Sequence, residues 1–152
     1  MEKNQIAVVQ SEIDAQILEI DTIYEKIDER KGLKNQFELE GLSLWLHHLY
    51  CAFEDLFKIV AKAFENNIID EERYHIELLK RMTYEIDGVR PALLSGPSFK
   101  LLDTLRAFRH RLRHAYVYDL DKEKVTVVLD DALKLRALYK KDVGKFIRTL
   151  GS

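Results

Sequence analysis

The chain has 152 residues, of which 47% are hydrophobic and 33% are charged, with a formal net charge of -2. Its 6 glycines and 2 prolines make up about 5% of the chain, against roughly 12% in an average protein. Because the turns of sandwiches and barrels usually need Gly, Pro, Asn or Asp, this scarcity excludes a many-turned β fold and predicts a few long helices. The length fits a single domain over residues 1–152 that buries a core without disulfides.

The single cysteine, Cys51, excludes an intramolecular disulfide and fits a reducing compartment. The N-terminal segment lacks the apolar stretch and cleavage site of a signal peptide, and no run reaches the ~18 apolar residues of a membrane span. We therefore expect a soluble, cytoplasmic protein without a membrane partner. An evenly spread charge of -2 would also argue against a nucleic-acid partner.

Apolar residues recur at helical spacing in five segments of the chain. The first segment covers residues 6–30, with Gly32 as its stop. The second covers residues 36–65 and has the widest apolar face, which predicts the central, most buried helix. A third, shorter helix is predicted from an N-cap at Asp70 to Tyr84.

The remaining chain contains one segment rich in helix breakers, residues 89–97, which follows a stop signal at Asp87-Gly88. Its Leu93-Leu94 pair predicts an ordered loop with local packing rather than a domain linker. A fourth helix is predicted over residues 98–115, and Asp121 is the predicted N-cap of a fifth. The pattern as a whole indicates an all-α, up-and-down bundle of four to five helices.

Positive charge is concentrated at the end of the fourth predicted helix. Residues 106–114 contain four arginines and two of the five histidines, and no acid occurs between Asp103 and Asp119. At helical spacing Arg106, Arg109 and Arg113 lie on one side of the helix. His110 and His114 lie on another side, and neither side coincides with the apolar face. Arginine suits phosphate oxygens and histidine can transfer protons near neutral pH. The alternative is a solvated face that balances the acidic first helix or the helix dipole.

The same segment contains the pattern R-x4-H-x-Y, formed by Arg109, His114 and Tyr116. With this pattern the sequence resembles the HEPN superfamily, and specifically the HepT-like ribonuclease toxins of HEPN/MNT toxin–antitoxin pairs. A polar residue often follows the arginine in that group, as His110 does here. Residues 46–57 also resemble the second-helix segment of the HepT-like group.

The resemblance implies a function and a set of site residues. Arg109 and His114 match the catalytic residues of a metal-independent endoribonuclease that cleaves tRNA or mRNA. Tyr116 matches the tyrosine that a partner MNT-type nucleotidyltransferase modifies with AMP (AMPylation) to silence the toxin. The resemblance implies no cofactor and no metal ligand, and it implies a homodimer in which two motifs line one cleft. Independently, residues 109 and 114 lie about 140° apart around a straight helix, so either the helix unwinds after Leu112 or a second subunit completes the site.

These residues suggest a mechanistic hypothesis. His114 would act as general base or acid toward the RNA 2′-hydroxyl or the leaving 5′-oxygen, and Arg109 would stabilise charge on the phosphorane. His110 would share the proton transfer or orient His114. The other arginines of the segment would hold flanking phosphates: Arg106, Arg111 and Arg113. The alternatives are a non-catalytic HEPN binding module that partners a nucleotidyltransferase, and a purely structural helical adaptor.

Several weaker signals are assigned to ordinary structural roles. Glu72-x-x-His75 has the spacing of a di-metal bundle motif but no second copy, which favours surface or hydrogen-bonded residues. His47 and Cys51 are four residues apart and could form a pair, although a small buried thiol is the commoner outcome. Glu54 or Asp55 of the second helix could pair with Arg109, although a solvated or structural salt bridge is an equal alternative. Tyr118 could be a second modification site or part of the exposed helix end.

Overall fold

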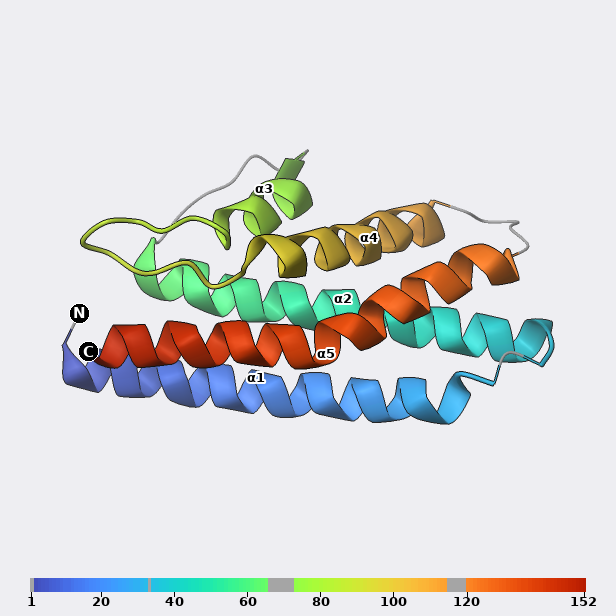
Figure 1. Ribbon diagram of the computed structural model, residues 1–152, viewed down its shortest axis with the longest axis horizontal. Coiled ribbons are helices and arrows are strands. Elements are labelled where there is room, and N and C mark those ends of the chain that lie inside the picture. The colour runs from blue at the N-terminus through green and yellow to red at the C-terminus, as the bar shows by residue number, and fades with distance from the viewer. Residues whose placement is uncertain (1, 33, 66–72, 115–119) are drawn as a thin grey trace.

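The computed structural model describes residues 2–32, 34–65, 73–114 and 120–152. Within these ranges the chain forms five helices, and Figure 1 shows them in a lengthwise stack. The helices are α1 (Lys3–Arg30), α2 (Gln36–Phe64), α3 (Tyr74–Arg81), α4 (Gly96–Arg113) and α5 (Lys122–Gly151). Apart from an isolated bridge between Ile86 and Arg90, the described residues contain no strand pairing. The prediction of an all-α bundle is confirmed.

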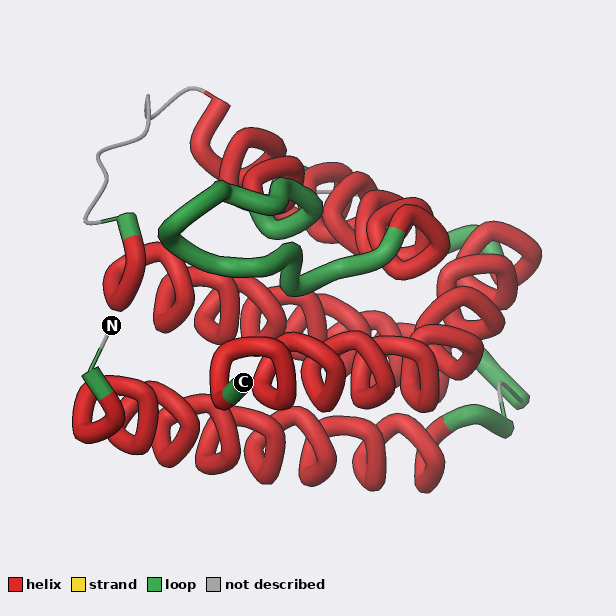
Figure 2. Tube along the Cα trace, turned by 60° about the vertical axis from the view of Figure 1, so that its left-hand side comes forward, coloured by secondary structure: helices red, strands yellow, loops and turns green. Residues whose placement is uncertain are grey.

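The four long helices alternate in direction along the bundle (Figure 1), as the up-and-down arrangement requires. Helix α2 packs against each of the other four helices, whereas α1 contacts only α2 and α5. The short helix α3 lies against α2 and α4, above the plane of the long helices. Figure 2 shows the same stack from another side, with the loop before α4 crossing over it. The predicted central position of the second helix is confirmed.

The core is formed by the apolar stripes that the sequence predicts. Four stripe residues of α1 and six of α2 are completely buried: Ile13, Ile20, Tyr24, Ile27, Leu42, Leu46, Phe53, Leu56, Phe57 and Val60. On α4 the buried apolar residues are Leu102, Leu105 and Phe108. Leu101, which stands at helical spacing before Leu105 and Phe108, is only half-buried. The side chains of all five helices join one continuous buried cluster, in which Leu93 and Leu94 of the loop also take part. The pair therefore packs into the main core and not only locally.

Helix ends are set by short polar side chains. Asp121 accepts a hydrogen bond from the backbone N–H of Glu123, which confirms the predicted N-cap of α5. Ser95 caps α4 in the same way, accepting from the N–H of Ser98, and Pro97 stands in the first turn, where its missing N–H costs nothing. The predicted cap Asp70 lies outside the described residues.

The third helix is shorter than the sequence predicts, ending at Arg81 and not at Tyr84. The reason is that the loop takes over the backbone groups that would continue the helix. The carbonyl of Arg81 accepts from Arg90, and the carbonyl of Met82 accepts from the N–H groups of Leu93 and Leu94. The Asp87-Gly88 stop signal instead forms a tight turn in which Gly88 has a φ of +75°, a conformation that favours glycine.

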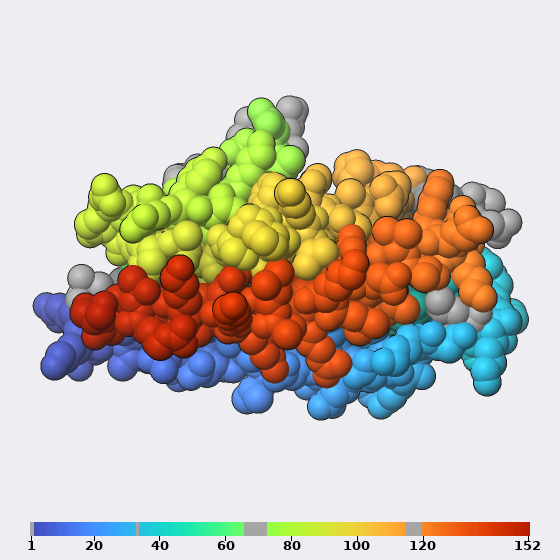
Figure 3. Space-filling view, in the orientation of Figure 1, coloured from blue at the N-terminus to red at the C-terminus, as the bar shows by residue number. Residues whose placement is uncertain are grey.

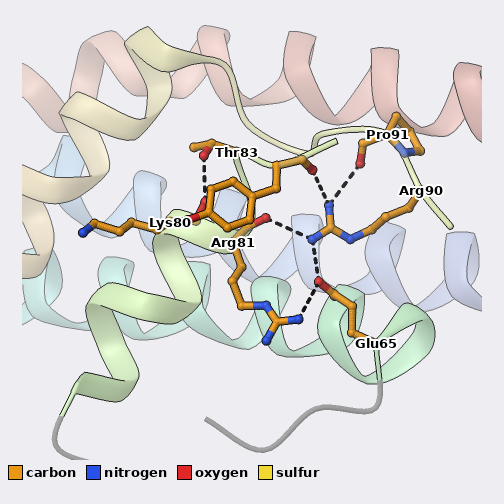
Figure 4. A network of polar contacts seen from close by, with 7 residues as sticks. Glu65, Lys80, Arg81, Thr83, Arg90 and Pro91 are labelled. Atoms are coloured by element: carbon orange, nitrogen blue, oxygen red, sulfur yellow. Dashed lines mark hydrogen bonds and ion pairs between the residues drawn. The ribbon is translucent and has the colours of Figure 1, made fainter. Parts of the chain in front are cut away.

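Arg90 holds this loop from inside the protein, as Figure 4 shows. Its side chain is 0% exposed. The guanidinium donates to the carbonyls of Tyr84, Arg81 and Pro91, and to Glu65 Oε1 at 2.8 Å. Glu65 also pairs with Arg81 at 3.1 Å. Nη1 and Nη2 thus have four acceptors between them, whereas Nε is buried without a described partner. A buried charge needs such acceptors, so this network fixes the chain just before α4 begins.

A second polar contact attaches the start of α4 to α5. The carboxylate of Asp142 accepts hydrogen bonds from the Ser95 N–H, the Ser95 hydroxyl and the Ser98 hydroxyl. Ser98 is completely buried. The first turn of α4 is thus bound both to the loop network and to the neighbouring long helix.

Candidate functional site

The candidate site lies toward the opposite end of α4, where the cationic segment meets α2 and α3. Figure 3 shows this end of α4 at the surface, beside the first half of α5. Helix α4 runs to Arg113, and His114 is its C-cap residue, with an N–H that bonds back to the carbonyl of Arg111. The helix therefore ends at Arg113, one residue beyond the predicted point of unwinding, and His114 is the first residue that leaves it.

Arg109 is the best-anchored residue of the cationic segment. Its Nε donates to Cys51 Sγ on α2 at 3.3 Å, and its Nη1 lies 3.5 Å from His75 Nε2 on α3. Neither contact comes from a carboxylate, and the described residues place no acid within ion-pair distance of Arg109. Contacts to two helices fix the guanidinium plane, while the remaining N–H groups are not used by these two contacts.

His75 connects Arg109 to a buried carboxylate. Its Nδ1 lies 2.7 Å from Glu54 Oε2, and Glu54 is only 3% exposed. The sequence offers Glu54 and Asp55 as possible partners of Arg109. Glu54 instead contacts His75, which in turn contacts Arg109, and the exposed Asp55 faces Lys58 at 3.9 Å. Within the described chain no group of three or more His, Cys, Asp or Glu side chains has a geometry that could hold a metal ion, and Glu72 lies outside it.

His47 and Cys51 form the α2 side of the site. Cys51 Sγ lies 3.8 Å from His47 Nε2, so the pair suggested by their spacing is present, and the thiol is half-buried and not fully buried. Burial lowers the pKa of His47, and the positive charges of Arg109, His48 and Arg113 lower it further. Arg109 and Arg113 are four residues apart on α4, which places them on the same side of that helix.

His110 and His114 lie together, as their spacing predicts, with ring centroids 4.6 Å apart. Both are exposed at the end of α4, away from the core. No described contact joins either ring to Arg109. The structure thus contains two neighbouring groups, an anchored arginine and an exposed histidine pair, on adjacent sides of one helix end.

The flanking arginines divide into two sides. Arg106 forms an ion pair with Asp103 at 2.8 Å within α4. By helical spacing Arg113 shares the side of Arg109. Arg111 instead borders the start of α5, together with Asp121 and Lys124. The structure therefore does not bring Arg111 together with Arg109. Tyr116 and Tyr118 lie outside the described residues.

The described contacts do not favour the alternative in which the arginines balance the acids of α1. Helices α1 and α4 do not contact each other. Asp21 and Asp28 of α1 instead pair with Lys140 and Arg136 of α5, each at 2.8 Å. Among the described residues, Arg109, Arg111 and Arg113 take part in no ion pair, so this helix end presents positive charge to its surroundings.

Glu54 and His75 are the site residues whose role the sequence did not reveal. His75 was assigned to the surface or to an ordinary hydrogen bond, and the hydrogen bond is present. One signal in the sequence could have indicated the contact. A carboxylate within the apolar face of the second helix needs a hydrogen-bond partner when it is buried, and a histidine on the neighbouring third helix can be that partner.

Comparison with known proteins identifies the family. The family model described as HepT-like protein matches residues 41–150, which include most of α2 and all residues of the site. The chain therefore belongs to the HepT-like family, and at family level this places it among the HEPN-type, nuclease-related proteins. No curated protein and no solved structure matches the chain. None of the helices that the structure describes is long and apolar enough to cross a membrane.

Proposed function

We propose that the protein is a metal-independent endoribonuclease toxin of a HEPN/MNT pair that cleaves tRNA or mRNA in the cytoplasm. The observation that carries this proposal is the uncompensated charge of Arg109, which is fixed by a thiol and an imidazole and has no described acid within ion-pair distance. A fixed, charged, planar donor is suited to the oxygens of a phosphodiester. Family membership and the neighbouring histidine pair support the same reading.

In the proposed reaction, His114 takes the proton from a ribose 2′-hydroxyl, and the 2′-oxygen attacks the adjacent phosphorus. The bond from phosphorus to the 5′-oxygen breaks, and that oxygen receives a proton from the protonated histidine pair, leaving a 2′,3′-cyclic phosphate and a 5′-hydroxyl. Arg109 stabilises the negative charge that builds on the phosphorane oxygens. His110 is close enough to His114 to share the proton transfer. Because the nucleophile is a 2′-hydroxyl, the substrate is RNA and not DNA.

Arg106 and Arg113 are proposed to hold the phosphates on either side of the cleaved bond, since their spacing places them on the side of Arg109. Arg111 was predicted to do the same, but it lies on the other side of α4, so its contact would be with a more distant part of the RNA. A homodimer would bring a second copy of the motif to the site.

Regulation is proposed to occur at Tyr116, two residues beyond His114. An MNT-type nucleotidyltransferase partner would transfer AMP to its hydroxyl, adding bulk and negative charge beside the phosphate site. Intact-mass measurement after co-expression with such a partner is expected to show one or more AMP additions, which Tyr116→Phe removes. An unmodified Tyr116 in an inactive complex would contradict this proposal.

The ribonuclease activity is tested by incubating the pure protein with tRNA or mRNA in EDTA. We expect cleavage by the wild type and a loss of about 10²- to 10⁴-fold in His114→Ala, because that is the usual contribution of a proton-transfer group. Circular dichroism should show an unchanged fold, since His114 is exposed. Full activity of His114→Ala would contradict the assignment. Binding of RNA or of a nucleotidyltransferase without any cleavage would instead support a binding module.

A further inference from the structure

Glu54 is a carboxylate in an environment that does not favour free charge. It lies in the middle of α2 and is only 3% exposed. A buried carboxylate is costly unless a hydrogen-bond donor satisfies it, and His75 Nδ1 provides such a donor at 2.7 Å. Burial, and then the negative charge of Glu54, raises the pKa of the neighbouring Tyr50, so that phenol stays protonated. Glu54 and His75 therefore form a short polar contact that joins α2 to α3.

The two contacts of His75 determine which ring nitrogen carries the proton. An ionised carboxylate only accepts hydrogen bonds, so Nδ1 must carry the hydrogen that faces Glu54. The other nitrogen, Nε2, faces Arg109 Nη1, which can only donate. Both contacts are satisfied by the neutral ring with hydrogen on Nδ1. A doubly protonated ring would place two donors, both positively charged, against each other.

This arrangement fixes the orientation of Arg109. Cys51 Sγ holds Nε, and His75 holds one hydrogen of Nη1. Contacts at two atoms from two different helices restrict the rotation of this planar group about its long axis. The edge carrying Nη2 then keeps one direction, and a displacement of about 1 Å at such a group can cost on the order of 10²-fold in rate.

We infer that Glu54 and His75 form a positioning pair for the RNA-cleaving arginine: Glu54 holds His75 in the tautomer whose Nε2 accepts from Arg109, and His75 aims the guanidinium at the phosphate. Neither residue touches the substrate. This inference rests on the proposed function, because it assigns the purpose of the orientation to phosphate binding by Arg109.

The tautomer is tested first, on the protein without RNA. Nitrogen NMR of the imidazole rings distinguishes a protonated from an unprotonated ring nitrogen. In the wild type we expect His75 to carry hydrogen on Nδ1 and not on Nε2. In Glu54→Gln, whose amide can also donate, we expect a mixture of the two tautomers. Hydrogen on Nε2 in the wild type, or an unchanged spectrum in Glu54→Gln, would overturn the inference.

The positioning role is tested with two replacements that differ in what they offer Arg109. His75→Gln keeps a donor for Glu54 and an acceptor for Arg109. His75→Lys satisfies the charge of Glu54 but presents only donors to Arg109. We expect cleavage by His75→Gln within a few-fold of the wild type, and a loss of about 10²-fold in His75→Lys.

Both variants should keep the thermal stability of the wild type within a few degrees, because Glu54 stays paired in each. His48→Gln, a half-buried histidine elsewhere on α2, is the matched control and should cleave like the wild type. Equal cleavage by the Gln and Lys variants, at either a high or a low rate, would overturn the positioning role.

Failure of the proposed function gives a different result. If the wild type cleaves no RNA under any condition, the ribonuclease proposal falls, and the pair is then tested by binding of a 2′-deoxy oligonucleotide that cannot be cleaved. Weaker binding by His75→Lys than by His75→Gln would support the positioning of Arg109. Equal binding would overturn it.

Discussion

The two ends of α4 use charged residues in opposite ways. Before the first turn, the buried Arg90 donates hydrogen bonds to Glu65 and to three backbone carbonyls. Asp142 accepts hydrogen bonds from Ser95 and Ser98 at the same end. Toward the last turn, Arg109 contacts a cysteine sulfur and an imidazole nitrogen, and Arg111 and Arg113 have no ion pair among the described residues. Polar groups that are satisfied within the protein hold a fold together, whereas charges left without partners remain available for a ligand.

The largest effect is expected from breaking the network at the first end. Arg90→Ala removes a completely buried guanidinium and takes one hydrogen-bond donor away from each of three carbonyls and from Glu65. We expect a loss of about 3 kcal/mol in the free energy of unfolding, measured by urea denaturation. Arg111→Ala, an exposed arginine of the other end, is the control and should change stability by less than about 0.5 kcal/mol. Comparable losses in both variants would remove the distinction between the two ends.

Asp142→Ala should have the next largest effect, because it leaves the Ser95 and Ser98 hydroxyls and one backbone N–H without their acceptor. We expect a loss of about 2 kcal/mol in the free energy of unfolding. Asp130→Ala, an exposed aspartate on the same helix, should change it by less than about 0.5 kcal/mol. A loss of RNA cleavage by Asp142→Ala in protein that is still folded would show that the first end of α4 also contributes to function, contrary to the distinction between the two ends.

At the second end, the two sides of the helix should differ in RNA binding. Arg113→Ala removes a charge on the side of Arg109, and we expect about tenfold weaker binding and a salt dependence reduced by about one counterion. Arg111→Ala removes the same charge on the side facing α5 and should have a smaller effect. Fluorescence anisotropy with labelled RNA at several salt concentrations measures both quantities. An equal loss in the two variants would indicate a general attraction without a defined site.

The smallest effect concerns His47, whose pKa is lowered in the folded protein by burial and by Arg109. Below its ordinary value of 6.5, the unfolded chain binds more protons at this residue than the folded chain, so the stability falls as the pH falls. His47→Gln removes this contribution. Between about pH 7 and pH 5, its unfolding temperature should fall by about 1 °C less than that of the wild type. An identical pH dependence of the unfolding temperature in both proteins would contradict a lowered pKa of His47 in the folded protein.

The helices were predictable because burial on one face repeats every few residues, a property that local sequence carries. The same holds for the cap at Asp121, two residues from its donor. The end of α3 was not predictable, because the group that ends it, Arg90, follows Arg81 by nine residues and acts through a loop. Local periodicity does not encode which carbonyl a later side chain will reach.

The site divides in the same way. Arg109, His110 and His114 are adjacent in the chain, so their spacing alone identified them as candidates. His75 is separated from Arg109 by 34 residues and from Glu54 by 21. Their meeting depends on how α3 lies against α2 and α4, which is set by the packing of the whole bundle and by the loop that Arg90 holds.

The length of α4 has a consequence for how substitutions combine. Eleven residues separate Ser98 from Arg109, a span of about 16 Å along a helix. Substitutions more than about 10 Å apart that share no partner usually have additive effects on free energy. The effect on stability of a substitution that strengthens the Ser95–Asp142 contact should therefore be the same with or without a substitution at Arg109. The stability that the Ser95–Asp142 contact provides can therefore change without a direct effect on the chemistry at Arg109.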